Sequence, residues 1–371
     1  MMTFETLITY MAEYKEEMTA EERMEAYLKG EEVDHIPYSL NVSEFAAGLY
    51  GYTIQQYRDY IDVQLDVMQK MNQEFGMKNI RFGVGLKAIG ISVGSKAQNP
   101  ANGIDYIDET YLKDYQQLSE MKIIDVKKCP NLVKILENYR ECRAQLPEWK
   151  SVNRVAGPMT TAVGIRAIEQ ILRDTIKNKE NLHRLLSYSV TCTLQWIKAV
   201  TEEFGPIPVS ISEPVGSLTV LSKKQFLEFE KPHLIELVKG ITDITGLHPG
   251  LHICGRTKDI WNDLTQMGFS SLGIDNIENL QDAKNEIGDK IRISGNVPPV
   301  DILKAGTVDQ VIDSVKDCLL KGADSPKGYI LAPGCQIPPE TPRENLYAYI
   351  YAARKYGKDA KIGHLPLGLM Q

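Results

Sequence analysis

The chain has 371 residues, of which 43% are hydrophobic and 25% charged, so it can bury a large core and still keep a solvated surface. Its formal net charge of −7 argues against a nucleic-acid partner, which requires a clustered basic face. The first 15 residues mix charged and apolar side chains, and no stretch approaches the roughly 20 apolar residues of a membrane span. We therefore expect a globular, cytoplasmic protein without a membrane partner.

In chain order, a predicted helix at residues 19–29 belongs to an N-terminal helical extension of about 34 residues, and short β-rich runs then alternate with helical patterns. This alternation is the signature of βα units around a parallel sheet. Eight strands are predicted, at 35–41, 79–85, 152–157, 208–213, 248–254, 271–275, 292–297 and 329–335. Eight units predict an α/β fold, a single (β/α)₈ TIM barrel domain over residues 1–371.

Two further segments carry local signals. The stretch 86–130 is long, contains Gly90 and Gly94, and follows the second strand, so it is a candidate cover for the barrel mouth. After the last strand, Thr341 to Glu344 predicts a capping box with proline at the first position of the final helix.

Six cysteines in a chain of this length are too sparse for a disulfide framework and fit reduced thiols or metal ligation. Four of them lie in or beside helical patterns without polar companions at ligand spacing, and we expect them to be small core residues: Cys129, Cys142, Cys192 and Cys318. Cys254 and Cys335 remain as candidate ligands.

His252 and Cys254 are two residues apart on a predicted strand, so their side chains point to the same side. Cys335 ends the last predicted strand, and the working residues of such barrels gather where strands end. One nitrogen and two sulfurs suit zinc, and three protein ligands leave a fourth position for substrate. The sequence therefore predicts an open, catalytic zinc site.

A thiol that binds to zinc loses its proton, which supplies a nucleophile at neutral pH. An electron-rich set of sulfur ligands makes the zinc a weaker Lewis acid and keeps a bound thiolate reactive toward an alkyl group. S-alkylation is the favoured chemistry, with water activation second.

Three polar residues at predicted strand ends are candidate catalytic residues. Glu213 fits three roles: the fourth zinc position at rest, the acceptor of the thiol's proton, or a solvated loop acid. Asp275 and Asn296 fit substrate orientation or support of a ligand histidine, with strand-end hydrogen bonding as the alternative. His248, four residues before His252, is expected to be a core histidine.

Four motifs resemble the uroporphyrinogen decarboxylase superfamily, and within it the methylcobalamin:coenzyme M methyltransferase branch. They are LHICGR at 251–256, ISGNVPP at 293–299, APGC at 332–335 and PPETPREN at 338–345. The resemblance extends from Glu21 and from Asp34-His35-Ile36-Pro37 to the C-terminal helix, so it covers nearly the whole chain.

The resemblance implies a (β/α)₈ barrel whose zinc is held by His252, Cys254 and Cys335. It also implies a methyl group that comes from methylcobalamin on a corrinoid protein. The acceptor would be a zinc-activated thiol such as coenzyme M, or another acceptor such as the pterin tetrahydrofolate. The chain has no Asp-x-His-x-x-Gly corrinoid-binding motif, so the donor would be a separate partner protein.

The sequence departs from the decarboxylases of this superfamily, which carry paired arginines soon after the first strand and a histidine in place of Cys335. Here Tyr38 follows Pro37, and the next arginine is Arg58. A decarboxylase or lyase is therefore the second hypothesis, and a non-catalytic corrinoid or substrate carrier is the third.

Overall fold

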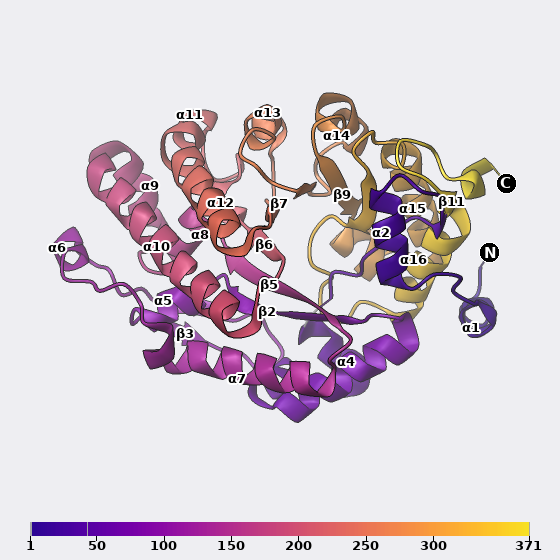
Figure 1. Cartoon of the computed structure of the whole chain (residues 1–371), viewed down its shortest axis with the longest axis horizontal. Helices are drawn as coiled ribbons and strands as arrows, with labels where there is room; N and C mark the ends of the chain where they lie inside the picture. The colour runs from indigo at the N-terminus through magenta and orange to yellow at the C-terminus, as the bar shows by residue number, and fades with distance from the viewer. Residues whose placement is uncertain (1, 43, 371) are drawn as a thin grey trace. The chain divides into compact units, whose positions relative to one another are not determined.

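A parallel sheet of seven strands runs through the computed structural model, which describes residues 2–42 and 44–370 (Figure 1). The strand order is β10-β9-β8-β7-β6-β5-β2. Each of these strands lies where the sequence predicts one: β2 Asn79–Gly85, β5 Lys150–Ala156, β6 Val209–Ser212, β7 Gly250–His252, β8 Ser271–Gly273, β9 Arg292–Val297 and β10 Tyr329–Pro333.

The first predicted strand, 35–41, differs from the prediction. Strand β1 (Val33–His35) pairs in antiparallel fashion with β11 (Lys358–Ala360), outside the parallel sheet. Tyr38 then forms an isolated parallel bridge with Leu331 of β10. Pro37 has no N–H to donate, which limits the ladder at this position. With this bridge beside β10, the chain has the eight parallel positions of a (β/α)₈ barrel, and the predicted fold class is confirmed.

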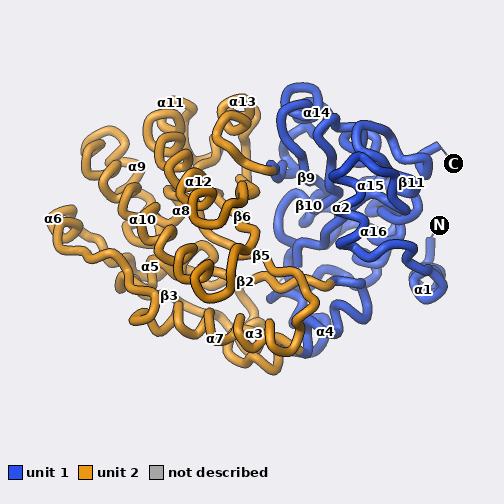
Figure 2. The backbone as a smooth tube through the Cα atoms, viewed as in Figure 1, with its two compact units in different colours: residues 1–52, 66–77, 271–371 blue, residues 53–65, 78–270 orange. Residues whose placement is uncertain are grey.

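The chain divides into two compact units, coloured in Figure 2. Unit 1 comprises Met1–Tyr52, Asp66–Met77 and Ser271–Gln371, and unit 2 comprises Thr53–Leu65 and Lys78–Ser270. The single domain expected over residues 1–371 stays a prediction.

Unit 2 carries the strands β2, β5, β6 and β7 with their helices. Its longest helix, α10 (Lys179–Phe204), packs beside α12 (Lys231–Thr245; Figure 1). The buried Trp196 indole donates a hydrogen bond of 2.9 Å to Asn153 of β5, which fixes α10 to the sheet. The main helices are α7 Pro130–Gln145, α8 Pro158–Val163, α9 Ile168–Lys177, α10 Lys179–Phe204 and α12 Lys231–Thr245.

The segment 86–130 of unit 2 has secondary structure of its own. It contains α5 (Ala88–Ser92), the antiparallel pair β3 (Lys96–Gln98) and β4 (Tyr106–Glu109), and α6 (Tyr115–Leu118). Its role as a cover for the barrel mouth stays a prediction.

Unit 1 carries β8, β9 and β10, and the N-terminal helices pack there. Helix α2 lies within the predicted range 19–29 and begins with a capping box between Thr19 and Glu22. Glu16 accepts hydrogen bonds from Arg23 and from Arg354 of the C-terminal helix, so charged groups join the two ends of the chain. The helices are α1 Phe4–Glu13, α2 Ala20–Leu28, α14 Leu280–Ile287, α15 Val308–Gly322 and α16 Arg343–Tyr356.

The predicted capping box at the start of α16 is wrong. Pro342 occupies the N-cap position, and the Thr341 hydroxyl donates to the Pro338 carbonyl (2.9 Å) instead of accepting from the helix. Within residues 2–42 and 44–370, no helix has both the length and the apolar character needed to cross a bilayer.

Candidate functional site

His252 and Cys254 bring two ligand atoms together at the end of β7. The Nε2 atom of His252 lies 3.1 Å from the Sγ atom of Cys254, and both side chains are half-buried. Gly255 follows with a φ of 93°, and a Cβ atom there would lie 2.6 Å from the Thr219 hydroxyl oxygen. The chain can therefore turn directly after Cys254 only because residue 255 is glycine.

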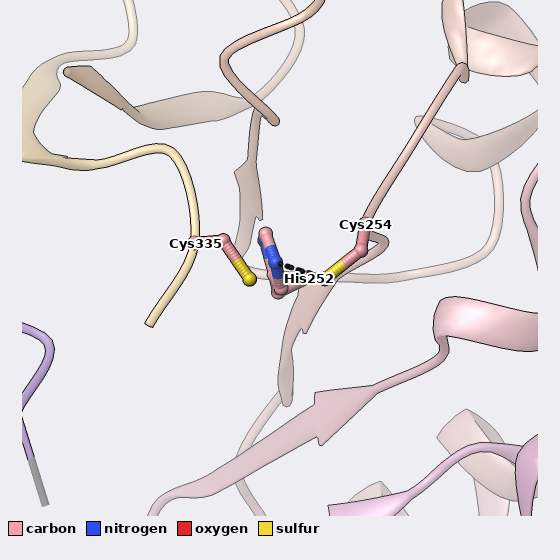
Figure 3. Close-up of side chains that lie close together, drawn as sticks. All are labelled: His252, Cys254 and Cys335. Atoms are coloured by element: carbon pink, nitrogen blue, oxygen red, sulfur yellow. Dashed lines mark hydrogen bonds between the residues drawn. The ribbon is translucent and has the colours of Figure 1, made fainter. Parts of the chain in front are cut away.

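Cys335 follows β10 and Gly334, a glycine that lies close to the backbone of another loop. A Cβ atom at Gly334 would lie 2.5 Å from the backbone nitrogen of Asn276, so the loop that carries Cys335 packs closely on the loop after β8. Figure 3 shows Cys335 with His252 and Cys254. Each of the three residues offers one possible ligand atom: His252 and Cys254 belong to unit 2, and Cys335 belongs to unit 1.

The described residues hold a second group of this kind, Glu16, Asp34 and His35 in unit 1. Arg23 donates to Asp34 over 2.6 Å, and His35 Nε2 lies 3.2 Å from Glu16. Burial would raise the pKa of Glu16, but the His35 hydrogen bond and the charges of Arg354 and Arg23 lower it to about 2. Arginine already balances these carboxylates, so the group is a structural ion-pair network.

Glu213 lies one residue beyond β6 and is fully buried, so the alternative of a solvated acid is wrong. Its carboxylate accepts hydrogen bonds from the Thr160 N–H (3.0 Å), the Gly216 N–H (3.1 Å) and the Thr160 hydroxyl. Its own N–H donates to the His252 carbonyl over 2.9 Å. Burial outweighs these hydrogen bonds and raises the pKa of Glu213 to about 7.

A second buried acid, Glu230, is absent from the candidates predicted from the sequence. It is fully buried in the π-helical turn Phe226–Glu230. A Cβ atom at Gly216 would lie 2.8 Å from Cγ of Glu213 and 3.2 Å from Cγ of Glu230, so both acids pack on that glycine. An acid in an amphipathic helical pattern usually faces solvent, so no signal in the sequence distinguishes Glu230.

Asp275 and Asn296 lie together in unit 1, and both are buried. The Asn296 amide donates to the carbonyls of Asp275 (3.1 Å) and Glu278 (2.9 Å). An Asp275 carboxylate oxygen accepts from the Ile277 N–H over 3.0 Å. Both side chains therefore make the hydrogen bonds expected of the strand-end alternative, and their catalytic roles stay predictions.

The model of the family described as uroporphyrinogen decarboxylase (URO-D) matches residues 19–356. The chain belongs to the uroporphyrinogen decarboxylase family. The match runs from the N-cap of α2 to the last residue of α16, so it includes every candidate site residue described above.

Curated relatives of this URO-D family member have two kinds of name. The chain is 29% identical over 224 residues to the methylcobamide:CoM methyltransferase MtaA of Methanosarcina barkeri, and 25% identical over 201 residues to a methylated-thiol–coenzyme M methyltransferase of Methanosarcina mazei. It is also 26% identical over 180 residues to a uroporphyrinogen decarboxylase of Idiomarina loihiensis. These matches cover 60%, 54% and 48% of this chain, and 63%, 52% and 48% of the three relatives.

A solved structure described as a methyltransferase from Methanosarcina mazei has the same fold. Its TM-score is 0.76 at 24% identity, and the superposition covers 92% of this chain and 99% of that one. The likeness supports the barrel and extends over both units.

His248 of this URO-D family member is not a core histidine, so that prediction is wrong. It is exposed in the loop before β7, which begins two residues later than predicted, at Gly250. Its Nδ1 atom lies 2.9 Å from the Gly268 carbonyl oxygen.

The four remaining cysteines are all free thiols. Cys142, Cys192 and Cys318 are buried, as predicted, whereas Cys129 is half-buried at the start of α7.

Proposed function

We propose that this URO-D family member is a zinc-dependent methyltransferase, which moves a methyl group from methylcobalamin on a corrinoid protein to a thiol such as coenzyme M. The observation that carries the proposal is the 3.1 Å approach of His252 Nε2 to Cys254 Sγ at the end of a barrel strand. The names of the Methanosarcina relatives support the methyl transfer and the coenzyme M acceptor.

The donor set fits zinc. Bonds of about 2.0–2.3 Å at a tetrahedral angle separate a nitrogen and a sulfur ligand by roughly 3.5 Å. The pair His252 and Cys254 reaches this separation if the two atoms move apart by a few tenths of an ångström. Cys335 is the proposed third ligand, and it completes a set of one imidazole and two thiolates that leaves one position open.

Zinc held by this set would lower the pKa of an incoming thiol and so supply a sulfur nucleophile at neutral pH. Cys254 and Cys335 would contribute the two negative charges that balance the ion. Glu213 is the proposed acceptor of the thiol's proton, because its pKa of about 7 suits proton uptake near neutral pH. Three hydrogen bonds from Thr160 and Gly216 hold its carboxylate in place, which favours this role over the fourth ligand position.

The corrinoid donor is proposed as a separate partner, since the sequence lacks a corrinoid-binding motif of its own. Asp275 and Asn296 are proposed to orient the substrate indirectly, because their hydrogen bonds to the backbone shape the loop after β8. The six free thiols fit a reducing compartment and support the proposed cytoplasmic location.

The decarboxylase alternative has less support, because the paired arginines that decarboxylases of this superfamily carry soon after the first strand are missing from this sequence. The first arginine after Pro37 is Arg58, and its guanidinium already bonds to the Gly103 carbonyl (3.2 Å) and lies 3.6 Å from Asp105.

Demethylation of methylcobalamin tests the proposal. We expect a change in the cobalt absorption spectrum when the zinc-loaded protein is mixed with methylcobalamin and coenzyme M. We expect no decarboxylation when uroporphyrinogen is supplied as the substrate. Absence of demethylation with every thiol and with tetrahydrofolate would favour a carrier. Capture of a corrinoid protein by the immobilised chain tests the partner.

A further inference from the structure

Glu230 is a buried acid. Its side chain has no exposed surface, and neither carboxyl oxygen has a hydrogen-bond partner in the part of the chain that the structure describes. Burial and the charge of Glu213 raise its pKa well above the usual range, against a smaller lowering by the Met159 N–H. Burying an ionised carboxylate without a cation is strongly unfavourable, so the favoured state is the neutral acid.

The backbone explains how an acid reaches this place. Glu230 ends the π-helical turn Phe226–Glu230, and helix α12 begins at the next residue. Within the same turn, Glu228 is half-exposed and pairs with Lys179 over 2.7 Å. A π-helical turn shifts the helix register, and such turns are frequent at functional sites. The shift places Glu230 among buried groups while Glu228 keeps an ordinary surface ion pair.

Glu213 and Glu230 are neighbours in unequal surroundings. Both pack on Gly216, and a Cβ atom at Gly157 would lie 2.0 Å from a Glu213 carboxylate oxygen, so two glycines make room for the acids. Glu213 accepts three hydrogen bonds, which stabilise its charged form, whereas the charged form of Glu230 is favoured by the Met159 N–H alone, the smallest of the influences on its pKa. Paired carboxyls in unequal environments separate into one acid and one carboxylate. The shared proton therefore resides on Glu230.

We propose that Glu230 is a neutral carboxylic acid and a positioning residue, whose O–H donates toward the Glu213 carboxylate and holds it beside β7. The pair then carries one buried negative charge instead of two. The role of Glu213 as acceptor of the thiol's proton rests on the proposed function, whereas the protonation of Glu230 does not. The Glu213 N–H bond to the His252 carbonyl connects the pair to the candidate zinc ligand.

Infrared spectroscopy tests the protonation directly. A protonated carboxyl has a carbonyl stretch apart from the carboxylate bands, and we expect it in the wild-type protein at a pH well above 7, where Glu213 is ionised. The band should persist in Glu228→Gln, the matched control from the same turn, and vanish in Glu230→Gln. Absence of the band from the wild-type protein would overturn the proposal without any variant, as would its survival in a folded Glu230→Gln protein.

Methyl transfer tests the positioning. Glutamine keeps a hydrogen-bond donor at residue 230, whereas leucine keeps only the bulk. We expect Glu230→Leu to lose about tenfold to a hundredfold in kcat, as for a lost hydrogen bond to a charged group, with bound zinc unchanged, and Glu230→Gln to restore most of the rate. Equal rates for leucine and wild type, or equal losses for both variants, would overturn the positioning role. If the wild-type protein transfers no methyl group, the proposed function fails and the infrared result still decides the state of Glu230.

Discussion

The backbone N–H of Glu213 donates a 2.9 Å hydrogen bond to the carbonyl of His252, which connects the end of β6 to the end of β7. The buried acid and the imidazole are therefore held by adjacent strands of one sheet. Rigid elements place catalytic groups more accurately than mobile loops do. The bond gives the proposed proton acceptor a fixed position relative to the proposed zinc ligand.

Loss of one sulfur ligand should release the metal. Cys335→Ser is expected to lower the zinc content from about one ion per chain and to abolish methyl transfer while the fold survives, since a hydroxyl replaces a thiolate ligand. The control Cys129→Ser removes a half-buried thiol that lies outside the candidate ligand set. Metal analysis of both purified variants checks this. Full zinc content and full rate in Cys335→Ser would remove Cys335 from the site.

Removal of the metal should be reversible and selective. We expect a chelator to abolish methyl transfer and added zinc to restore it. Added magnesium should not restore methyl transfer, because magnesium prefers oxygen ligands. The rate after each addition is the measurement. Recovery with magnesium alone would contradict a site built from imidazole and thiolates.

The buried acids should make stability depend on pH. The pKa of Glu213 rises from 4.5 to about 7, and that of Glu230 is raised well above 4.5 by burial and by the charge of Glu213. Between these pKa values the folded state binds more protons than the unfolded state. The contribution of the two acids to the free energy of unfolding is therefore highest below about pH 4.5 and declines as the pH rises through 7. The slope is about 1.4 kcal/mol per pH unit for each proton taken up.

Urea denaturation across this pH range measures the decline. Glu230→Gln cannot take up that proton and should show a shallower slope than wild type or Glu228→Gln. Glu16, whose pKa is lowered to about 2, acts in the opposite direction and in a different window, because its contribution disappears only as the pH falls below 4.5. Identical slopes for wild type and Glu230→Gln would speak against proton uptake by Glu230.

Asn296→Ala should destabilise unit 1, because two carbonyls of the loop after β8 lose their buried donor. The expected loss is about 1–3 kcal/mol in the free energy of unfolding. The control Asn285→Ala lies on the exposed surface of α14 and should change stability by about 0.5 kcal/mol or less. An unchanged stability together with a lower kcat would instead assign Asn296 to the chemistry.

Strand positions followed from the sequence where the pattern was local. The apolar bodies of β2 and β9 end at Gly85 and Val297, and both strands have the predicted bounds. The close approach of His252 and Cys254 also follows from their spacing of two residues, because side chains of that spacing share one side of a strand.

Features that depend on distant partners could not be predicted in this way. Burial of Glu230 depends on a π-helical turn and on space left by Gly216, and neither leaves a periodic signal. His248 shares strand parity with His252, yet β7 starts only after Pro249, so the histidine lies in a loop. Strand β1 needs β11 as its partner, more than 300 residues away, which no local pattern can indicate.

X-ray absorption at the zinc edge counts the sulfur ligands of the ion and so tests the proposed metal site. We expect one nitrogen and two sulfurs from the protein, with a third sulfur when coenzyme M is added. A sulfur count that does not change with the thiol, or a purified active protein without zinc, would contradict this prediction.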